Sequence, residues 1–388
     1  MVEWKKLGDI MTIVRGASPR PIKNYITNDG SGTNWIKIGD VAPGAKYITS
    51  ANEKITKEGA EKSRYLHSGD FVLSNSMSFG RPYILKIDGC IHDGWIAMSD
   101  YEKFLSSGYL YEILNSNNVQ NYWKIKANNG GAMTNLNSDI VRETVIPVPS
   151  LSEQTRIVGI LDTFTASIEN LKEQIAERRK QYEHYRDMLF SGSTCIKKIG
   201  ELTKVFSCPR VFREQWQDSG IPFWRSSDVM SYHNGVRNPR GEAFISQSLY
   251  DELSSKSEKI EEGDLLVTGG GSIGIPYLKR DNSPLFVKDA DLLCIKKCDS
   301  IIPSYLYHFF FSTDFKLYLK RITHDATIAH YTIGQIIETP IPVPSLEEQS
   351  RIVSILDTFE ASIANLEAQL KEREKQYEYY RNKLLTFE

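Results

Sequence analysis

A glycine-rich stretch, VTGGGSIGIP at 267–276, is the pattern in this chain that most resembles a site for chemistry. Glycines after an apolar strand let backbone amides approach a phosphate, as they do in nucleotide-binding loops. A second segment of the chain argues against nucleotide binding as the role of these glycines: the related stretch LSNSMSFGRP at 73–82 has Asn75, Ser76 and Met77 in their place. The residues that follow, IPYLK, are typical of a strand and not of a helix. We therefore expect a turn whose exposed tip differs between two copies, and no nucleotide site.

The other residues with catalytic or metal-binding potential form no familiar set. His324 and His330 lie in HDATIAH, a spacing that fits neither one face of a helix nor a usual zinc pattern. Cys294 and Cys298 form a single CxxxC pair without further ligands, and Glu3 in EWK lacks the upstream aspartate of a nuclease site. Hydrolase, zinc-protease, Walker and base-methylation motifs are absent from the sequence. The sequence therefore predicts no catalytic residue and no metal site.

Length and composition describe a large folded protein. A chain of 388 residues suffices for roughly two to four units, each with its own core. Hydrophobic residues at 40% and charged residues at 25% are typical of globular proteins. No segment approaches the roughly 18 apolar residues of a membrane span, so we expect a cytoplasmic protein. The five cysteines, an odd number, are then expected to be reduced thiols.

One long segment occurs twice. Residues 146–190 and 341–385 are identical at about 31 of 45 aligned positions, which indicates duplication of a large unit. Each copy opens with Pro-Val-Pro and a serine, Ser150 or Ser345, placed three residues before a glutamate as in a helix capping box. Apolar residues then recur at alternating steps of four and three, which predicts a long helix with a coiled-coil seam. The two seams are most simply satisfied by each other, and the alternative is that each helix packs on a separate core.

The chain direction sets the sense of this helix pair. The first helix is expected to end at Ser-Gly-Ser, residues 191–193, where new globular sequence begins at once, so the second helix must lead back. The expected fold is α+β, with two mixed α/β globular domains held apart by two long antiparallel coiled-coil helices in a pseudo-two-fold dumbbell. We expect the first globular domain at 1–145, the first helical spacer at 146–190, the second globular domain at 191–340 and the second helical spacer at 341–388.

The two globular domains share landmarks but differ in their loops. KKLGDI at 5–10 corresponds to KKIGEL at 197–202, and YLYEIL from Tyr109 corresponds to YLYHFF from Tyr305. Two related but non-identical domains on a rigid spacer can read two different targets at a set separation. DNA is such a target, since one to one and a half turns of about 34 to 36 Å each fit the expected spacer.

This order of elements, with the IPxPSLxEQxRI helix signature present twice, closely resembles the specificity subunit of type I restriction-modification systems over the full chain. The resemblance implies a non-catalytic DNA-binding subunit. Each globular domain would be a target recognition domain that reads a few base pairs in the major groove of a bipartite, asymmetric site, and the helices would measure the gap.

The resemblance also implies the partners and cofactors. The partners would be double-stranded DNA, two adenine methyltransferase subunits and, in the full complex, restriction subunits. S-adenosylmethionine and ATP with magnesium are expected on those partners, and no cofactor is expected in this chain. The alternative is a coiled-coil protein-binding scaffold that does not recognise DNA.

The charge distribution bears on how such a chain would hold DNA. Net charge is −2, with 17 basic and 15 acidic residues in 1–145, and 18 of each in 196–340. The helical segments carry −1 at 146–195 and −3 at 341–388. Because neutralised phosphates supply most sequence-independent affinity, nearly neutral domains should bind DNA weakly alone. We expect the partner subunits to complete the positive surface.

Base or phosphate contacts are predicted for loop residues whose side chains can reach base edges, with ordinary surface solvation as the alternative for each. In the first domain these are Arg15, Arg20, Lys37, Asn75, Ser76, Arg81, Asn128, Asn129 and Asn135. In the second domain they are Arg210, Arg213, Arg225, Ser272, Lys288, Arg321, His324, His330 and Tyr331.

Four helix residues at equivalent places in the two copies, outside the seam, are predicted to dock the two methyltransferase subunits. They are Gln154, Arg156, Gln349 and Arg351. Salt bridges within the helix pair are the alternative.

Overall fold

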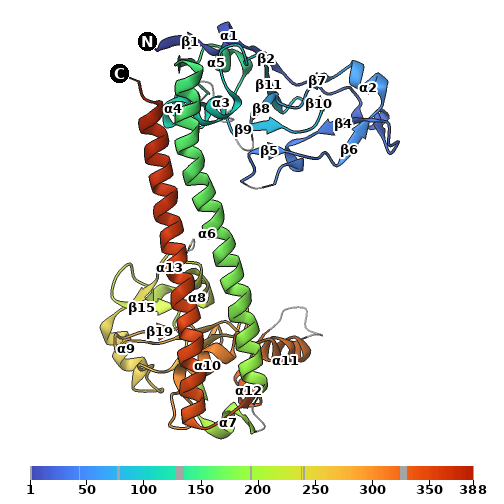
Figure 1. Cartoon of the computed structure of the whole chain (residues 1–388). Coiled ribbons are helices and arrows are strands. Elements are labelled where there is room, and N and C mark those ends of the chain that lie inside the picture. The colour runs from blue at the N-terminus through green and yellow to red at the C-terminus, as the bar shows by residue number, and fades with distance from the viewer. Residues whose placement is uncertain are drawn as a thin grey trace. The chain divides into compact units, whose positions relative to one another are not determined.

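The computed structural model describes the following residues: 2–42, 44–76, 79–127, 135–192, 195–236, 238, 241–323 and 330–387. The chain divides into two compact units (Figure 1). Unit 1 comprises residues 1–172 and 369–388, and unit 2 comprises residues 173–368. Each unit therefore combines a continuous globular segment with a part of each long helix.

Unit 1 contains mixed strands and short helices that lead into the first long helix, α6. In chain order they are β1 (Glu3–Lys6), α1 (Leu7–Ile10), β2 (Thr12–Arg15), η1 (Ile22–Asn24), β3 (Ile26–Thr27), β4 (Thr33–Ile36), η2 (Ile38–Asp40), β5 (Tyr47–Ile48), β6 (Glu53–Ile55), α2 (Lys57–Glu61), β7 (Arg64–Leu66), β8 (Phe71–Ser74), β9 (Pro82–Leu85), β10 (Gly89–Ile91), β11 (Trp95–Ser99), α3 (Ser107–Leu114), α4 (Asn117–Ala127), α5 (Ser138–Arg142), β12 (Val145–Val148) and α6 (Leu151–Ser191).

Unit 2 is built in the same way and leads into the second long helix, α13. Its elements are β13 (Ile196–Lys198), α7 (Ile199–Leu202), β14 (Val205–Phe206), η4 (Arg213–Gln215), β15 (Ile221–Trp224), α8 (Ser226–His233), β16 (Phe244–Ile245), α9 (Gln247–Ser254), β17 (Leu265–Thr268), β18 (Pro276–Leu278), β19 (Phe286–Val287), β20 (Leu292–Ile295), α10 (Pro303–Phe309), α11 (Thr313–Thr323), α12 (Ile333–Ile337), β21 (Pro340–Pro342) and α13 (Leu346–Leu385).

The central sheet of unit 1 has the order β2-β11-β8-β9-β5, and its inner strands β8 and β9 are buried on both faces. Because side chains alternate along a strand, Phe71 and Leu73 point into one core while Val72 points into another. The first core also contains Tyr109 of α3, and the second contains Ile36 of the other five-stranded sheet. The apolar run FVLS is therefore continuous because both faces of β8 are covered.

Unit 2 repeats this topology. Its central sheet has the order β14-β20-β17-β18, which corresponds to β2-β11-β8-β9. Strand β15 pairs antiparallel with β16 and parallel with β19, just as β4 pairs with β6 and β10. The α+β class and the repeated scaffold predicted from the sequence are confirmed.

Both long helices begin as the Pro-Val-Pro segments predict. The hydroxyl of Ser150 accepts a hydrogen bond from the backbone N–H of Glu153 (3.3 Å), and Ser345 caps α13 in the same way (3.2 Å). The glutamate side chain does not complete a capping box, because it pairs with the arginine three residues ahead, Arg156 in the first helix. Capping thus depends on the serine alone.

Within each unit, α6 and α13 run antiparallel. In unit 1, Phe164 stacks on Tyr380 with ring centroids 5.3 Å apart, and in unit 2 Tyr185 stacks on Phe359 at 5.5 Å. The first turns of α6 instead join the globular core, where Leu161 is fully buried. The first turns of α6 therefore pack on a globular core and its later turns pack on α13, so each of the two packing alternatives predicted from the sequence describes a part of this helix. In the described part of the chain, no helix combines the length and apolarity needed to cross a membrane.

Candidate nucleic-acid interface

Five of the predicted DNA-contact residues gather around one hollow of about 590 Å³ in unit 1, which we call the unit 1 hollow. They come from the ends of three strands and one loop: Arg15 ends β2, Lys37 follows β4, Asn75 and Ser76 follow β8, and Asn135 precedes α5. Ile38, Gly39, His92, Asp93 and Gly94 complete the lining. Strands β2 and β8 belong to the central sheet and β4 belongs to the other five-stranded sheet, so the ends of strands from two sheets bring residues far apart in sequence together.

Asp93, which the sequence interpretation missed, organises this hollow. Its backbone carbonyl accepts hydrogen bonds from Arg15 Nε (3.0 Å) and from the side-chain amide of Asn75 (3.1 Å). Its carboxylate accepts one from the hydroxyl of Ser18 (3.0 Å) and lies 3.4 Å from the guanidinium of Arg20. Burial alone would raise the pKa of Asp93, but the bond from Ser18 and nearby positive charge outweigh burial and lower that pKa. The carboxylate stays ionised and positions its neighbours.

The other side of the unit 1 hollow is fixed by Lys37 and His92. Lys37 Nζ lies 2.5 Å from a carboxylate oxygen of Glu53, and its backbone N–H donates to Asp40 (2.8 Å). Burial lowers the pKa of His92, so this imidazole is neutral at neutral pH. The sequence does contain a pattern for His92 and Asp93, because the polar triplet HDG lies between two apolar strands. The prediction missed Asp93 because aspartate was not among the residue types expected to contact bases.

The remaining unit 1 predictions lie elsewhere. Arg81 is exposed, with its guanidinium 5.8 Å from the ring centroid of Tyr83. Asn128 and Asn129 fall outside the described residues. The unit 1 hollow therefore contains five of the nine predicted residues, with Arg20 tied to it through Asp93.

In unit 2, two predicted readers lie in the interior, which corrects the prediction for them. Arg225 is only 8% exposed. Its guanidinium is held inside because Nε donates to Asp228 (3.0 Å) and a terminal nitrogen donates to the carbonyl of Gly241 (2.7 Å). Tyr331 is 1% exposed, and its hydroxyl lies 2.5 Å from that of Thr339. Both side chains stabilise the fold and present no polar atom to a base.

Six other unit 2 predictions remain at the surface. They are Arg210, Arg213, Ser272, Lys288, Arg321 and His330. His324 falls outside the described residues. The structure does not bring the exposed six into the hollow of unit 2 described next.

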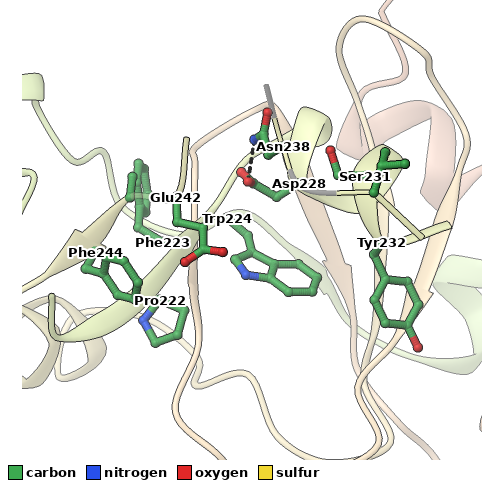
Figure 2. A pocket seen from close by; sticks show the side chains of 11 residues that line it. Pro222, Phe223, Trp224, Asp228, Ser231, Tyr232, Asn238, Glu242 and Phe244 are labelled. Carbon is green, nitrogen blue, oxygen red and sulfur yellow. Dashed lines mark hydrogen bonds between the residues drawn. The ribbon is translucent and has the colours of Figure 1, made fainter. Parts of the chain in front are cut away.

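The unit 2 hollow, about 330 Å³, has a different chemistry (Figure 2). Its walls are aromatic and aliphatic, with Trp224 on β15, Tyr232 on α8 and Phe244 on β16. Its charged residues are acidic: Glu242, and Asp228, which accepts a hydrogen bond from Asn238. An acidic, aromatic hollow does not attract phosphate, so the two units differ in the surfaces that they can offer to DNA.

The glycine-rich turn of unit 2 has a packing explanation. A Cβ on Gly269 would lie 2.7 Å from the carbonyl oxygen of Ala290 and 2.9 Å from that of Tyr331. Gly269 also donates its N–H to the carbonyl of Asp291 (2.8 Å), as Asn75 donates to Gly94 in unit 1 (3.1 Å). This glycine allows close approach of backbone segments, which is consistent with the turn expected there.

The two halves of the chain match one protein family. The family described as the type I restriction modification DNA specificity domain matches residues 1–178 and again residues 194–375. The chain belongs to this family of type I restriction-modification specificity subunits. The resemblance noted in the sequence is thereby confirmed.

Known relatives of this specificity subunit agree with that assignment. It is 28% identical to a candidate type I restriction enzyme specificity subunit of Haemophilus influenzae, over 100% of this chain and 96% of the relative. It is 29% identical to the EcoR124I/EcoR124II specificity subunit of Escherichia coli, over 62% of this chain and 61% of that subunit. Both relatives are named as specificity subunits of type I restriction enzymes.

Solved structures show the same fold. One chain from a study of complex assembly in a type I restriction-modification system has a TM-score of 0.68 and 18% identity, with 99% of this chain and 96% of that chain covered. The specificity subunit of Thermoanaerobacter tengcongensis has a TM-score of 0.52 and 19% identity, with the same coverage.

The helix starts of this specificity subunit revise the predicted docking residues. Gln154 is fully buried: its oxygen accepts from the N–H of Ser106 (2.8 Å), and its nitrogen donates to the carbonyls of Phe104 (2.8 Å) and Pro149 (3.0 Å). Gln349 makes the equivalent three bonds in unit 2. We call each set a glutamine clasp, and both glutamines have this internal role and offer no atom to a partner.

The two arginines differ from the glutamines. Arg156 and Arg351 have side chains that are 55% exposed, each in a bidentate pair with a glutamate on its own helix. They remain on the surface, so docking of a partner stays a prediction for these two residues.

Proposed function

We propose that this subunit reads a bipartite, asymmetric DNA site through base contacts in the major groove, one part of the site for each unit. The observation that carries the proposal is the unit 1 hollow, where Arg15, Lys37, Ser76 and Asn135 converge, while Asn75, which is 9% exposed and donates its amide to Asp93, supports the hollow from inside. Arginine and lysine recognise guanine O6 and N7, and asparagine recognises adenine, so these side chains match the acceptors and donors of purine edges. Asp93 holds Arg15 and Asn75 in place, which reduces the ordering cost of recognition.

The specificity subunit is proposed to act with two methyltransferase subunits and, in a full complex, with restriction subunits. Adenine methylation, S-adenosylmethionine, ATP and magnesium would belong to those partners. Two matched helix starts, with exposed Arg156 and Arg351 at equivalent positions, suit two copies of one partner. The helices are proposed to set the gap between the parts of the site; α6 alone has 41 residues and is about 60 Å long at 1.5 Å per residue.

The charge of the chain makes the partners necessary for tight binding. With a net charge of −2, the subunit alone has little to gain from counterion release. The methyltransferase subunits are therefore proposed to complete the positive surface around the duplex.

Selection from a random duplex library by the complex of this chain with its methyltransferase subunits tests the proposal. We expect a motif of two short specified blocks around an unspecified gap. Replacement of Arg15 or Lys37 by alanine should relax the block read by unit 1 and leave the other block unchanged. Recovery of random DNA by an intact complex would instead favour a protein-binding scaffold without DNA recognition.

A further inference from the structure

One position of the duplicated scaffold carries different chemistry in the two units. In unit 2, His308 on α10 faces Asp357 and Glu360 on α13 and Tyr182 on α6; we call these four residues the α10 cluster. The corresponding positions in unit 1 hold Glu112, Asp162, Thr165 and Tyr377. The tyrosine and the aspartate are kept, while a glutamate and a threonine in unit 1 become a histidine and a glutamate in unit 2.

The geometry of the α10 cluster places oxygen atoms around one imidazole. His308 is fully buried, with Nε2 2.8 Å from a carboxylate oxygen of Asp357 and Nδ1 3.0 Å from the hydroxyl of Tyr182. An oxygen of Glu360 lies 3.8 Å from Nδ1. The donor atoms of His308, Asp357 and Glu360 all lie within 4.8 Å of one another. Asp357 thus lies at Nε2, whereas the Tyr182 hydroxyl and the nearer Glu360 oxygen lie on the Nδ1 side, so an ion bound to Nε2 beside Asp357 requires Glu360 to turn toward it.

The negative charge of the cluster is not fully balanced. Asp357 and Glu360 lie three residues apart on α13, on the same helix face. Among the described residues, Glu360 makes no hydrogen bond, and its nearest ion-pair partner is His308 Nδ1 at 3.8 Å. Arg186, near Tyr182, already pairs with Asp187 (2.9 Å). An additional cation could bind the Glu360 carboxylate, since no described protein group donates a hydrogen bond to it.

Unit 1 shows how the scaffold is satisfied without such a cation. Glu112, 2% exposed, accepts a hydrogen bond from Tyr377 (2.8 Å), and burial raises its pKa. Thr165 there hydrogen-bonds to backbone carbonyls of its own helix. The histidine and the second carboxylate of unit 2 are thus not required by the fold, and both are metal-ligand types.

We propose that His308, through Nε2, binds a divalent transition-metal ion of the zinc class together with Asp357 and Glu360, with water as a further ligand and the Tyr182 hydroxyl hydrogen-bonded to the other ring nitrogen. Zinc takes imidazole nitrogen and carboxylate oxygen at roughly 2.0–2.2 Å, which places donor atoms roughly 3.3 Å apart in a tetrahedral site. The carboxylates can close that far, since the side chains of Asp357 and Glu360 are 45% and 34% exposed.

The metal would have a structural role, because its ligands join α10 of the globular part to α13, and the hydrogen bond between Tyr182 and His308 adds α6. The closely spaced histidines and cysteines of the sequence predicted no metal site. His308 lies 49 residues before Asp357, so only the fold brings these ligands together.

Metal titration of the untagged full chain, stripped with a chelator, tests the proposal. We expect one high-affinity Zn²⁺ per chain by calorimetry and visible Co²⁺ bands typical of a tetrahedral site. X-ray absorption of the zinc-loaded wild type should show one imidazole and two or three oxygen ligands. Absence of zinc binding by the wild type, or a ligand set without imidazole, would overturn the proposal.

The chain supplies its own matched variants. The double variant His308→Glu with Glu360→Thr installs the residues that unit 1 already accommodates, and it should lose the bound ion. His184→Gln removes a histidine outside the cluster and should keep it. Retention of the ion by the double variant would contradict the assignment of the site. The reverse change in unit 1, Glu112→His with Thr165→Glu, should raise the stoichiometry to two.

Discussion

Replacement of Gln154 by methionine tests whether this residue forms the internal glutamine clasp or docks a partner subunit. The clasp consists of three hydrogen bonds, to the N–H of Ser106 and to the carbonyls of Phe104 and Pro149, around a side chain with no exposed surface. Methionine fills a similar volume but leaves those three backbone groups without partners. At about 1 kcal/mol or more for each unsatisfied group, unit 1 should lose about 3 kcal/mol of local stability.

Hydrogen exchange measures this loss directly. When reclosing is faster than chemical exchange, so that the exchange rate reports the opening equilibrium, about 3 kcal/mol corresponds to roughly 100-fold faster amide exchange in the segment 104–110. The equivalent segment 300–306 in unit 2 is the internal control, since Gln349 is intact there. Arg156→Ala, at an exposed position two residues along the helix, should leave both segments unchanged. Unchanged exchange in Gln154→Met together with lost methyltransferase binding would refute the clasp and restore the docking role.

Three other changes have defined outcomes. Gly269→Ala should destabilise unit 2 and lower its melting temperature, because the new Cβ would lie 2.7 Å from the carbonyl of Ala290, whereas Gly334→Ala, where nothing lies within 4 Å, should not. Asp93→Ala should relax the DNA block read by unit 1, measured by library selection, with the second block unchanged, because it removes the carboxylate that accepts from Ser18 and pairs with Arg20. Burial raises the folded-state pKa of Glu112, so its protonated form is favoured on folding and stability is lost as pH rises through that pKa. Glu112→Gln should therefore gain stability relative to wild type as pH increases above the ordinary glutamate range, and a constant difference between pH 4 and 8 in denaturant titrations would contradict this.

The fold could be predicted largely because the chain repeats itself. The second copy of the helix signature exposed the duplication, and Ser150 and the Pro-Val-Pro punctuation marked the helix start. The prediction of a turn at the glycine-rich stretch also came from comparing copies. Comparison of the two copies within one chain thus distinguishes the shared scaffold from the variable loop tips, and no related sequence is needed for this.

The site was predictable only where residue type coincided with exposure. Arg15 and Lys37 end or follow strands and line the unit 1 hollow, whereas Arg225 is buried because Asp228, three residues later, holds its guanidinium inside. Gln154 has a polar side chain in the first turn of a helix, where the sequence predicted exposure. Its internal role is evident only from the carbonyl of the neighbouring loop, to which its side chain donates a hydrogen bond. The spacing of residues along the chain does not show which distant loops lie close together in the folded protein.

The most direct test of the central claim is a methylome. This chain would be co-expressed with its cognate methyltransferase subunit in a host without DNA methylation, and modified adenines would be mapped by single-molecule sequencing. We expect one asymmetric motif, with two short specified blocks, an unspecified gap and one modified adenine per block on opposite strands. No new methylation, despite co-purification of the two proteins and an active methyltransferase, would contradict sequence recognition by this subunit.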